Sequence, residues 1–348
     1  MESIIKFGLV GAGAIAQSYI QAFTTCENAK LVAVADVRLD AAKAIAEKIG
    51  CPSYDSYQTM AEKTDIDAVI ICTPPSTHPE IAVYFLEKKI HVLCEKPLSI
   101  GIKSAQKMLN AANKAGVKLT MASKFRYVED VIKARNIVNS GILGEIVLFE
   151  NAFTSRVDMS SRWNAQPQIS GGGVLIDNGT HSIDIMRYFL GPIAEVQVVE
   201  GKRVQSLQVE DTVRIFLRSK SGIVGNVDLS WTINKDLDYY IRIYGSQGTI
   251  SVGWKESKYR QSSSGDWIIF GKGYDKVQAF RSQIENFAKA ILGKEQLLIT
   301  SEDALASVEV IAAAYKSLHQ NQWVEVVGEI EDVNSANVNI SEIELHPV

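Results

Sequence analysis

The stretch that most constrains the fold lies near the N-terminus, where an apolar segment runs into a glycine-rich turn. Residues 4–10 are predicted to form a buried strand, and the turn 11–16, GAGAIA, opens a helix that we expect to run to about Cys26. A second apolar strand, 31–35, ends at Asp36. This order of strand, turn, helix, strand and acid is typical of a dinucleotide-binding α/β domain.

Each position of the turn has a physical reason in such a site. Gly11 makes the tight turn, Gly13 lets the backbone approach a pyrophosphate, and the small Ala16 allows the helix and strand to pack closely. The helix N-terminus offers N–H donors and a positive dipole end to the phosphates. We therefore predict that Gly11, Gly13, Ala14 and Ile15 bind the cofactor.

Asp36 and Arg38 bear on which dinucleotide is bound. The Asp36 carboxylate is placed to accept hydrogen bonds from the adenosine ribose hydroxyls, and it would repel a 2′-phosphate. Arg38 follows closely and is the residue that would favour a 2′-phosphate. We predict that both residues contact the cofactor and that NAD is preferred over NADP.

Strands and helices then alternate as far as residue 121, which predicts a doubly wound parallel sheet with helices on both faces. The expected helices are 39–49, 79–88 and 101–115, and the expected strands are 67–72, 90–94 and 117–121. Ligands of such sheets bind beyond the carboxyl ends of the strands. Two loops at such ends are therefore predicted to face the cofactor, through Thr73, Pro74, His78, Glu95 and Lys96. For His78 we favour a helix cap before Pro79, or a cap combined with a cofactor contact.

A second informative stretch, GGGVLIDNGTHSID, covers residues 171–184. Asp177, His181 and Asp184 share one stripe of a predicted helix, and the opposite face is apolar, with Ile183, Met186, Phe189 and Leu190. Ser170 is expected to cap the start of this helix and Gly191-Pro192 to end it. Three consecutive glycines weaken a helix, so we expect the backbone there to approach something closely, a substrate and cofactor in our interpretation. A surface helix with solvated acids is the alternative.

Four segments in this order, GAGAIA, TPPSTH, CEKP and GGGVLIDNGTHSID, resemble the glucose–fructose oxidoreductase / inositol 2-dehydrogenase / MocA-like (Gfo/Idh/MocA) family over about residues 1–325. The resemblance implies a Rossmann domain followed by an α/β domain with a large open, mainly antiparallel sheet. It also implies Lys96, Asp177 and His181 as the catalytic residues and a Lys96–Pro97 bond that is often cis. We expect domains at 1–122 and 123–330 and an appendage at 331–348.

The second domain adds candidate substrate contacts. A helix is predicted to begin at residue 124, and a strand at 145–153 leads to a loop, 154–169, before the glycine-rich helix. An aromatic and arginine cluster in this loop would suit a sugar carrying an anionic group. The predicted substrate-binding residues are Lys96, Lys124, Arg126, Arg156, Arg162, Trp163, Asp177 and His181.

The rest of the chain predicts a sheet that needs a cover on both faces. Strands are expected at 194–203, 210–219, 223–232, 238–245 and 248–253 as an antiparallel meander, and helices at 276–292 and 302–318. Relatives often bury this sheet against a partner subunit, so the resemblance implies a homodimer or homotetramer formed through it.

The composition limits the classes of partner that the protein is expected to bind. A net charge of −4 without a Lys/Arg run argues against nucleic acid, and no apolar run is long enough to cross a membrane. The four cysteines lack metal-binding spacing, and Asp177, His181 and Asp184 lack a second His or a Cys, so no metal is predicted. Buried thiols and the lack of a signal peptide indicate the cytoplasm.

These observations predict an NAD(P)-dependent oxidoreductase that interconverts a secondary alcohol and a ketone on a sugar, sugar derivative or cyclitol. Hydride moves to or from the nicotinamide, while Lys96 and His181 handle the hydroxyl proton and Asp177 orients the imidazole or bonds a neighbouring hydroxyl. Two other classes stay open, a non-catalytic NAD-binding regulator and an NAD-dependent glycosidase.

Overall fold

The computed structural model describes residues 4–327, which form two compact units. The first, called the Rossmann unit, comprises residues 4–99, 103–132 and 274–304. The second, called the sheet unit, comprises residues 100–102, 133–273 and 305–327. The Rossmann unit thus includes residues 274–304, beyond the range 1–122 expected from the sequence. The predicted appendage at 331–348 lies outside the described residues.

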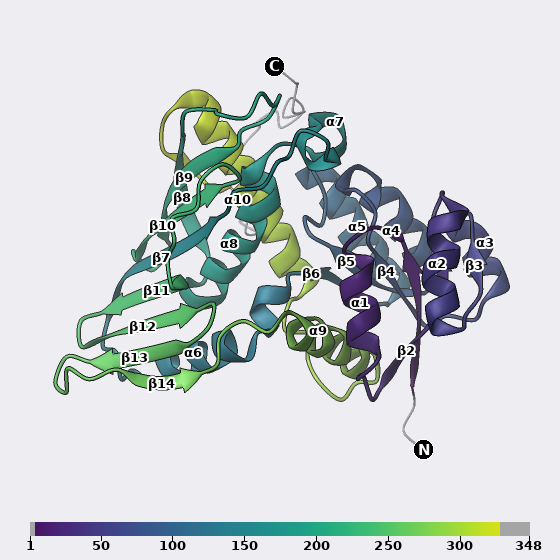
Figure 1. Ribbon diagram of the computed structural model, residues 1–348, viewed down its shortest axis with the longest axis horizontal. Helices are drawn as coiled ribbons and strands as arrows, with labels where there is room; N and C mark the ends of the chain where they lie inside the picture. The colour runs from purple at the N-terminus through teal and green to yellow at the C-terminus, as the bar shows by residue number, and fades with distance from the viewer. Residues whose placement is uncertain (1–3, 328–348) are drawn as a thin grey trace. The chain divides into compact units, whose positions relative to one another are not determined.

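The Rossmann unit contains a six-stranded sheet whose paired strands all run parallel, in the order β3-β2-β1-β4-β5-β6 (Figure 1). The strands are β1 (Ile5–Val10), β2 (Ala29–Ala35), β3 (Ser53–Tyr54), β4 (Ala68–Ile71), β5 (His91–Glu95) and β6 (Leu119–Ala122). The helices between them are α1 (Ala16–Phe23), α2 (Leu39–Ile49), α3 (Tyr57–Lys63), α4 (His78–Glu87) and α5 (Ile102–Ala115). The predicted doubly wound sheet is confirmed. Strand order reverses between β1 and β4, where such folds bind their ligands.

The sequence prediction missed β3 and α3 because both are short. Strand β3 has two residues, too few to show a period, and α3 has seven. The start of α3 is nonetheless well defined, because the Ser56 side chain accepts a hydrogen bond from the Thr59 N–H.

Helix α9 (Lys276–Ile291) belongs to the core of the Rossmann unit although it lies far along the chain. Its apolar stripe packs against α1 and β1: the rings of Phe280 and Tyr19 lie 4.8 Å apart edge to face, and those of Phe287 and Phe7 lie 6.2 Å apart. All four side chains are buried, so α9 is an integral part of this unit.

The sheet unit contains a nine-stranded sheet in the order β14-β13-β12-β11-β7-β10-β9-β8-β15 (Figure 1). Its strands are β7 (Ile146–Thr154), β8 (Ile193–Glu200), β9 (Thr212–Ser219), β10 (Val224–Ser230), β11 (Tyr239–Gly245), β12 (Gly248–Gly253), β13 (Ser257–Gln261), β14 (Ile268–Gly271) and β15 (Val324–Glu325). The expectation of an uninterrupted meander is wrong, because β7 lies between β10 and β11 and pairs parallel to β10. The large, mainly antiparallel sheet implied by the resemblance is confirmed.

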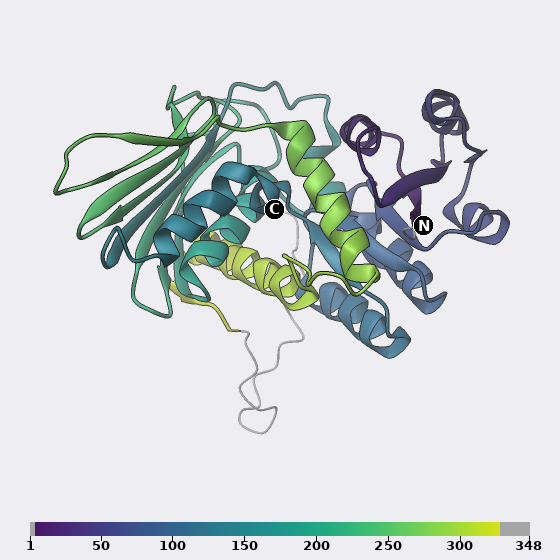
Figure 2. The ribbon, with the colours of Figure 1, turned by 90° about the horizontal axis from the view of Figure 1, so that it is seen from below.

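Helices cover one face of this sheet (Figure 2). Helix α8 (Val174–Leu190) packs on β7, β9 and β10, and Ser317 of α10 (Ser301–Gln320) accepts a hydrogen bond from the β8 backbone. Val213, Ile215 and Leu217 of β9 are buried, whereas Arg214 and Arg218 alternate with them on the other face. Among the described residues of the sheet unit, no helix covers that other face, which we call the open face. The remaining helical segments are η1 (Pro75–Thr77), η2 (Lys124–Tyr127), α6 (Glu129–Asn139), η3 (Trp163–Ala165) and α7 (Pro167–Ser170).

Among residues 4–327, no helix is both long and apolar enough to cross a membrane.

Candidate active site

The two glycines of the first turn differ in what surrounds them. Gly11 has φ +96°, and a Cβ there would lie 2.8 Å from the carbonyl carbon of Cys72, so the fold itself requires glycine. A Cβ at Gly13 would have no atom within 4 Å, and its φ lies outside the left-handed range. No packing reason therefore excludes a side chain at Gly13. The open space there fits a cofactor phosphate approaching the backbone, beside the exposed Ala14 and the half-buried Ile15.

Asp36 is held against this turn. One of its carboxylate oxygens accepts a hydrogen bond from the Ala12 N–H at 2.6 Å, and the other accepts one from the Arg38 N–H at 2.8 Å. The Asp36 side chain is only 11% exposed, while that of Arg38 is 67% exposed. The carboxylate thus lies at the end of β2 next to the glycine turn, the position that the ribose-binding acid has in dinucleotide-binding folds.

His78 joins the two loops that follow β4 and β5. Its ring is fully buried, with Nε2 2.8 Å from the carbonyl oxygen of Thr73 and Nδ1 2.9 Å from that of Pro97. Burial lowers the pKa of His78, against the opposing effect of these carbonyl contacts. The expectation that His78 caps the start of α4 is wrong, since Thr77 is the N-cap and His78 is the first residue of the helix; His78 is instead the C-cap of η1. Pro74, by contrast, stands at the N-cap of η1.

Glu95 and Lys96 follow β5 directly. Glu95 is 8% exposed and accepts hydrogen bonds from the Tyr19 hydroxyl at 2.7 Å and the Lys96 N–H at 3.2 Å. Burial raises the pKa of Glu95, and the Tyr19 bond and the charges of Lys96 and Lys124 oppose that rise. The positive charges of Lys96 and Lys124, two predicted ligand-binding residues, therefore both favour the ionised form of the buried Glu95. The Lys96–Pro97 bond is cis, as the resemblance implied.

Lys124 and Arg126 lie in η2, directly after β6. The Lys124 ammonium stands 5.3 Å from the ring centre of Phe125. The Arg126 side chain is 4% exposed, and it bonds the Leu298 carbonyl and the Asp303 carboxylate at 3.3 Å each. Arg126 thus has a structural role within the Rossmann unit, and its contact with substrate stays a prediction.

Helix α8 carries Asp177 and His181 but begins later than expected. Its N-cap is Gly173, so the prediction that Ser170 caps it is wrong. Ser170 ends α7, and its hydroxyl bonds the carbonyls of Gln166 and Gly172. The predicted end at Gly191 is confirmed.

Burial along α8 excludes the alternative of a surface helix with solvated acids. Asp177 is half-buried, His181 is 7% exposed and Asp184 is fully buried. Phe153, at the end of β7, packs edge-on against the His181 ring with centroids 6.5 Å apart. The Phe153 ring also packs against Tyr240 and Trp254, which contact each other. The sequence prediction missed this aromatic cluster.

The three glycines before α8 have a reason different from the one expected. A Cβ at Gly171 would lie 2.6 Å from the Ile100 side chain, and one at Gly172 would lie 1.8 Å from the Tyr315 hydroxyl. A Cβ at Gly173 would lie 2.1 Å from the carbonyl oxygen of Glu210. Atoms of the protein itself fill these positions, so the interpretation that they leave space for substrate and cofactor is wrong.

The loop between β7 and α7 carries the other predicted substrate contacts. Arg156, Arg162 and Trp163 are all exposed, Trp163 by 40%. They are available for ligand binding, and their contact with a substrate stays a prediction.

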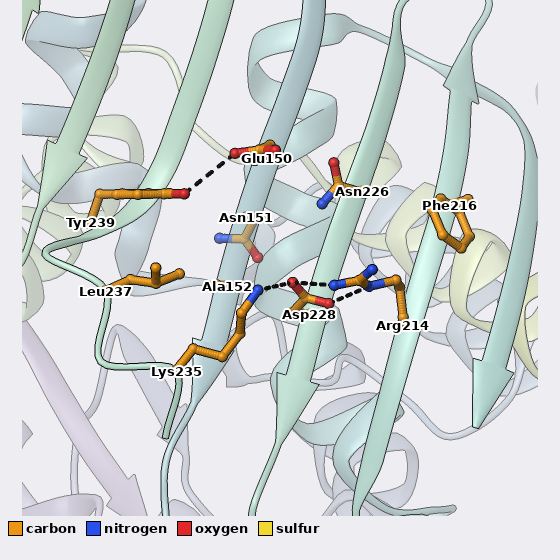
Figure 3. A pocket seen from close by; sticks show the side chains of 10 residues that line it. All are labelled: Glu150, Asn151, Ala152, Arg214, Phe216, Asn226, Asp228, Lys235, Leu237 and Tyr239. Carbon is orange, nitrogen blue, oxygen red and sulfur yellow. Dashed lines mark hydrogen bonds and ion pairs between the residues drawn. The ribbon is translucent and has the colours of Figure 1, made fainter. Parts of the chain in front are cut away.

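The open face of the large sheet is hollowed at one place (Figure 3). A cavity of about 300 Å³ lies over β7, β9 and β10, and none of the predicted site residues lines it. At its floor the Asp228 carboxylate accepts hydrogen bonds from Arg214 Nε at 2.5 Å and Lys235 Nζ at 2.6 Å. Burial would raise the pKa of Asp228, but its bonds with Arg214 and Lys235 lower it overall.

No group of three or more His, Cys, Asp or Glu side chains suited to a metal ion occurs in the described residues.

Comparison with known families agrees with this geometry. The oxidoreductase family with an NAD-binding Rossmann fold (GFO_IDH_MocA) matches residues 5–123, and the GFO/IDH/MocA C-terminal domain matches residues 131–251. The chain belongs to the Gfo/Idh/MocA oxidoreductase family. It is accordingly an oxidoreductase with an NAD-binding Rossmann domain.

Several proteins similar to this chain are named as sugar or cyclitol dehydrogenases. It is 27% identical over 338 residues to the inositol 2-dehydrogenase of Rhizobium meliloti, covering 92% of this chain and 99% of the relative. It is 34% identical over 194 residues to the D-glucoside 3-dehydrogenase of Escherichia coli, covering 55% of each. A solved structure of levoglucosan dehydrogenase with NADH has the same fold, with a TM-score of 0.87 at 22% identity over 93% of this chain and 99% of that one.

Proposed function

We propose that this protein is an NAD-dependent dehydrogenase that interconverts a secondary alcohol and a ketone on a sugar, sugar derivative or cyclitol. The observation that carries the proposal is the near full-length similarity to relatives named inositol 2-dehydrogenase, in a chain that has Lys96, Asp177 and His181. Secondary hydroxyl groups on a ring are what such relatives are named for, so the substrate is assigned to that class.

NAD is the cofactor that the first turn suits best. Gly13 leaves the backbone open to a pyrophosphate, and Asp36 stands beside the turn with a carboxylate that would repel a 2′-phosphate. Bound there, NAD would supply the hydride acceptor for alcohol oxidation. Gly11, Ala14, Ile15, Arg38, Thr73, Pro74 and Glu95 complete the proposed cofactor contacts, with His78 positioning the loops of Thr73 and Lys96.

The chain's own residues would manage the proton and the charge on oxygen. His181 takes the hydroxyl proton as the alcohol is oxidised, and Asp177, one helical turn earlier, orients its imidazole or bonds a neighbouring hydroxyl. Lys96 donates a hydrogen bond to the same oxygen and stabilises the negative charge that develops there. His181 is buried, with Phe153 packed edge-on against its ring, which would limit the access of water to this proton transfer.

Specificity is assigned to the exposed residues of the β7–α7 loop. Trp163 offers a face on which a sugar ring can stack, and Arg156 and Arg162 would pair with an anionic group such as a phosphate or carboxylate. Lys124 and Arg126 are the further candidates within the Rossmann unit. We accordingly favour an anionic sugar over a neutral one.

The open face of the large sheet is the proposed surface for self-association. It combines partly exposed apolar side chains, Val199 and Ile269 among them, with paired charges such as Arg214 and Asp228. A homodimer or homotetramer through this face would cover side chains that no described helix of the sheet unit covers. Light scattering of the purified protein tests it, because a strict monomer would exclude the proposal.

The reaction is tested by following absorbance at 340 nm with NAD⁺ or NADP⁺ against myo-inositol, scyllo-inositol, D-glucose, glucose 6-phosphate and methyl glucosides. We expect NADH to form with at least one polyol or sugar and His181→Ala to abolish it. No signal with any panel member and either cofactor would contradict the dehydrogenase assignment. Cleavage of a glucoside without net NADH would identify a glycosidase instead.

A further inference from the structure

Two neighbouring buried acids, Glu210 and Asp211, stand just before β9. Glu210 bonds the start of α8 directly, and Asp211 is linked to the β7–α7 loop through Gln205. Glu210 is 4% exposed and Asp211 is fully buried. The sequence placed both in the expected strand 210–219 and indicated no site role for either. Buried carboxylates are costly unless they are hydrogen-bonded, so their partners show what they hold in place.

Glu210 bonds the start of α8 through both its side chain and its backbone. Its Oε1 atom accepts hydrogen bonds from the N–H groups of Gly173 and Leu175, both at 3.0 Å, and from the Tyr315 hydroxyl at 2.8 Å. Its carbonyl oxygen accepts a further bond from the Val174 N–H at 3.0 Å. One residue thus satisfies three of the N–H groups that a helix start leaves unpaired, with a carboxylate at the positive end of the helix dipole.

This anchor acts on the turn of the helix that bears Asp177. The Asp177 N–H bonds the Gly173 carbonyl, so the position of Asp177 follows from that of the anchored residue. His181 lies one turn further along the same rigid helix. A Cβ added at Gly172 would meet the Tyr315 hydroxyl and one at Gly173 the Glu210 carbonyl oxygen, so the helix start is closely packed on these two residues.

Asp211 holds the loop between β7 and α7 through Gln205. Its Oδ2 atom accepts hydrogen bonds from the N–H groups of Val204 at 3.0 Å and Gln205 at 2.9 Å. The Gln205 side chain then donates to the Val157 carbonyl and accepts from the Met159 N–H, both at 3.0 Å. The loop so tied carries Arg156 at one side of these contacts and Arg162 and Trp163 at the other.

We propose that Glu210 and Asp211 are positioning residues with separate tasks: Glu210, with Tyr315, sets the placement of Asp177 and His181 for the chemical step, and Asp211, through Gln205, sets the loop that selects the substrate. This inference rests on the proposed function for its kinetic consequences, while the anchoring itself does not depend on activity. Because the two acids bond different segments, loss of each should affect a different kinetic constant.

The kinetic test uses the substrate that gives the highest rate in the panel above. Glu210→Ala should lower kcat by about ten- to a hundredfold with little change in KM for that substrate, since small displacements of reacting groups are costly. Glu210→Gln, which keeps an acceptor oxygen, should recover most of the loss. Gln205→Ala should instead raise KM for the substrate about tenfold at nearly unchanged kcat. KM for NAD⁺ should stay the same in all three variants.

Ser317→Ala is the matched control. Ser317 is fully buried in α10, two residues from Tyr315, and bonds the Val198 N–H and the Gln322 carbonyl rather than Glu210 or the α8 start. It should lower stability without changing kcat or KM. If Glu210→Ala does not fold, Tyr315→Phe carries the same test, because it removes one hydrogen bond to Glu210 while keeping the ring.

Hydrogen exchange separates failure of this inference from failure of the proposed function. Glu210→Ala or Tyr315→Phe should speed exchange of the amides at 173–177, Gln205→Ala those at 157–159, and Ser317→Ala neither. If the wild-type protein reduces no NAD⁺, the proposed function fails and these exchange rates still decide the anchoring. Unchanged exchange, or equal effects of Glu210→Ala and Gln205→Ala on both kcat and KM, would overturn the inference.

Discussion

Gly13→Ala separates a glycine required by the ligand from one required by the fold. The added methyl would meet no atom within 4 Å, and the backbone there is not left-handed. Replacing glycine at an unstrained position reduces the entropy of the unfolded chain, so stability should stay the same or rise by about 0.4–1 kcal/mol. In the complex, the same methyl would stand between the backbone and the pyrophosphate. Loss of one charge-assisted hydrogen bond, about 1.5–3 kcal/mol, corresponds to a roughly 10- to 150-fold weaker Kd for NADH.

The measurement pairs thermal unfolding of the ligand-free protein with a fluorescence titration of NADH. Gly11→Ala is the contrasting variant, because its φ of +96° and the 2.8 Å approach to Cys72 make the folded state itself intolerant. Left-handed strain and overpacking should together cost it about 2–5 kcal/mol and lower its Tm without ligand. The reasoning is refuted if Gly13→Ala binds NADH as tightly as the wild type, or if it melts well below it in the absence of NADH.

Three further changes test the structure at other points. Arg126→Ala should lower the free energy of unfolding by about 2–4 kcal/mol in urea titrations, since Asp303 loses its buried partner. This loss is smaller than that expected for a fully buried ion pair because the Asp303 side chain is 30% exposed. Asp36→Ala should raise kcat/KM for NADP⁺ relative to NAD⁺ by about tenfold or more, and an unchanged ratio would show that Asp36 does not select the cofactor. Because the folded state lowers the pKa of His78 below 6.5, its contribution to stability is present above that pH and is lost as the pH falls below it; His78→Gln should flatten the fall in unfolding free energy between pH 7 and 5.

The first half of the fold was predictable because its signals are local. The strands β1, β2, β4, β5 and β6 are short apolar runs, the helices between them are amphipathic, and the turn at Gly11 has chemistry that one backbone conformation explains. Parallel order then follows from the alternation itself. What the local signals could not show is which unit α9 joins, because its apolar stripe does not identify its partner. The packing of Phe280 and Phe287 assigns it to the Rossmann unit.

The order of strands in the second sheet was less predictable. Turn signals between β8, β9 and β10, and between β11 and β12, correctly indicated neighbours. The place of β7 depends on an interaction between segments about 75 residues apart, in which Val224 pairs with Leu148. The alternation of apolar and polar residues would equally allow β10 to pair with β11. Alternation specifies which side chains face the core but not which strands are neighbours.

In the candidate site, too, the residues proposed to do the chemistry could be predicted from the sequence, whereas the residues that hold them in place could not. Lys96, Asp177 and His181 are noticeable in the sequence because their side chains carry chemistry at telling positions. Glu210 and Tyr315 are not, because they lie 105 residues apart and meet only through the fold. The clue that was present, three consecutive glycines, reports a close approach without saying by what.

The structure shows that the atoms close to these glycines belong to neighbouring residues of the protein. Had ligand space been the reason, a Cβ at Gly172 or Gly173 would meet open space, as it does at Gly13. It meets the Tyr315 hydroxyl and the Glu210 carbonyl instead. The glycine-rich segment is therefore part of a joint that sets where α8 begins. Substitutions in that joint should act on catalysis through the helix, whereas Gly13→Ala acts through the cofactor, and exchange rates at 173–177 would change only in the first case.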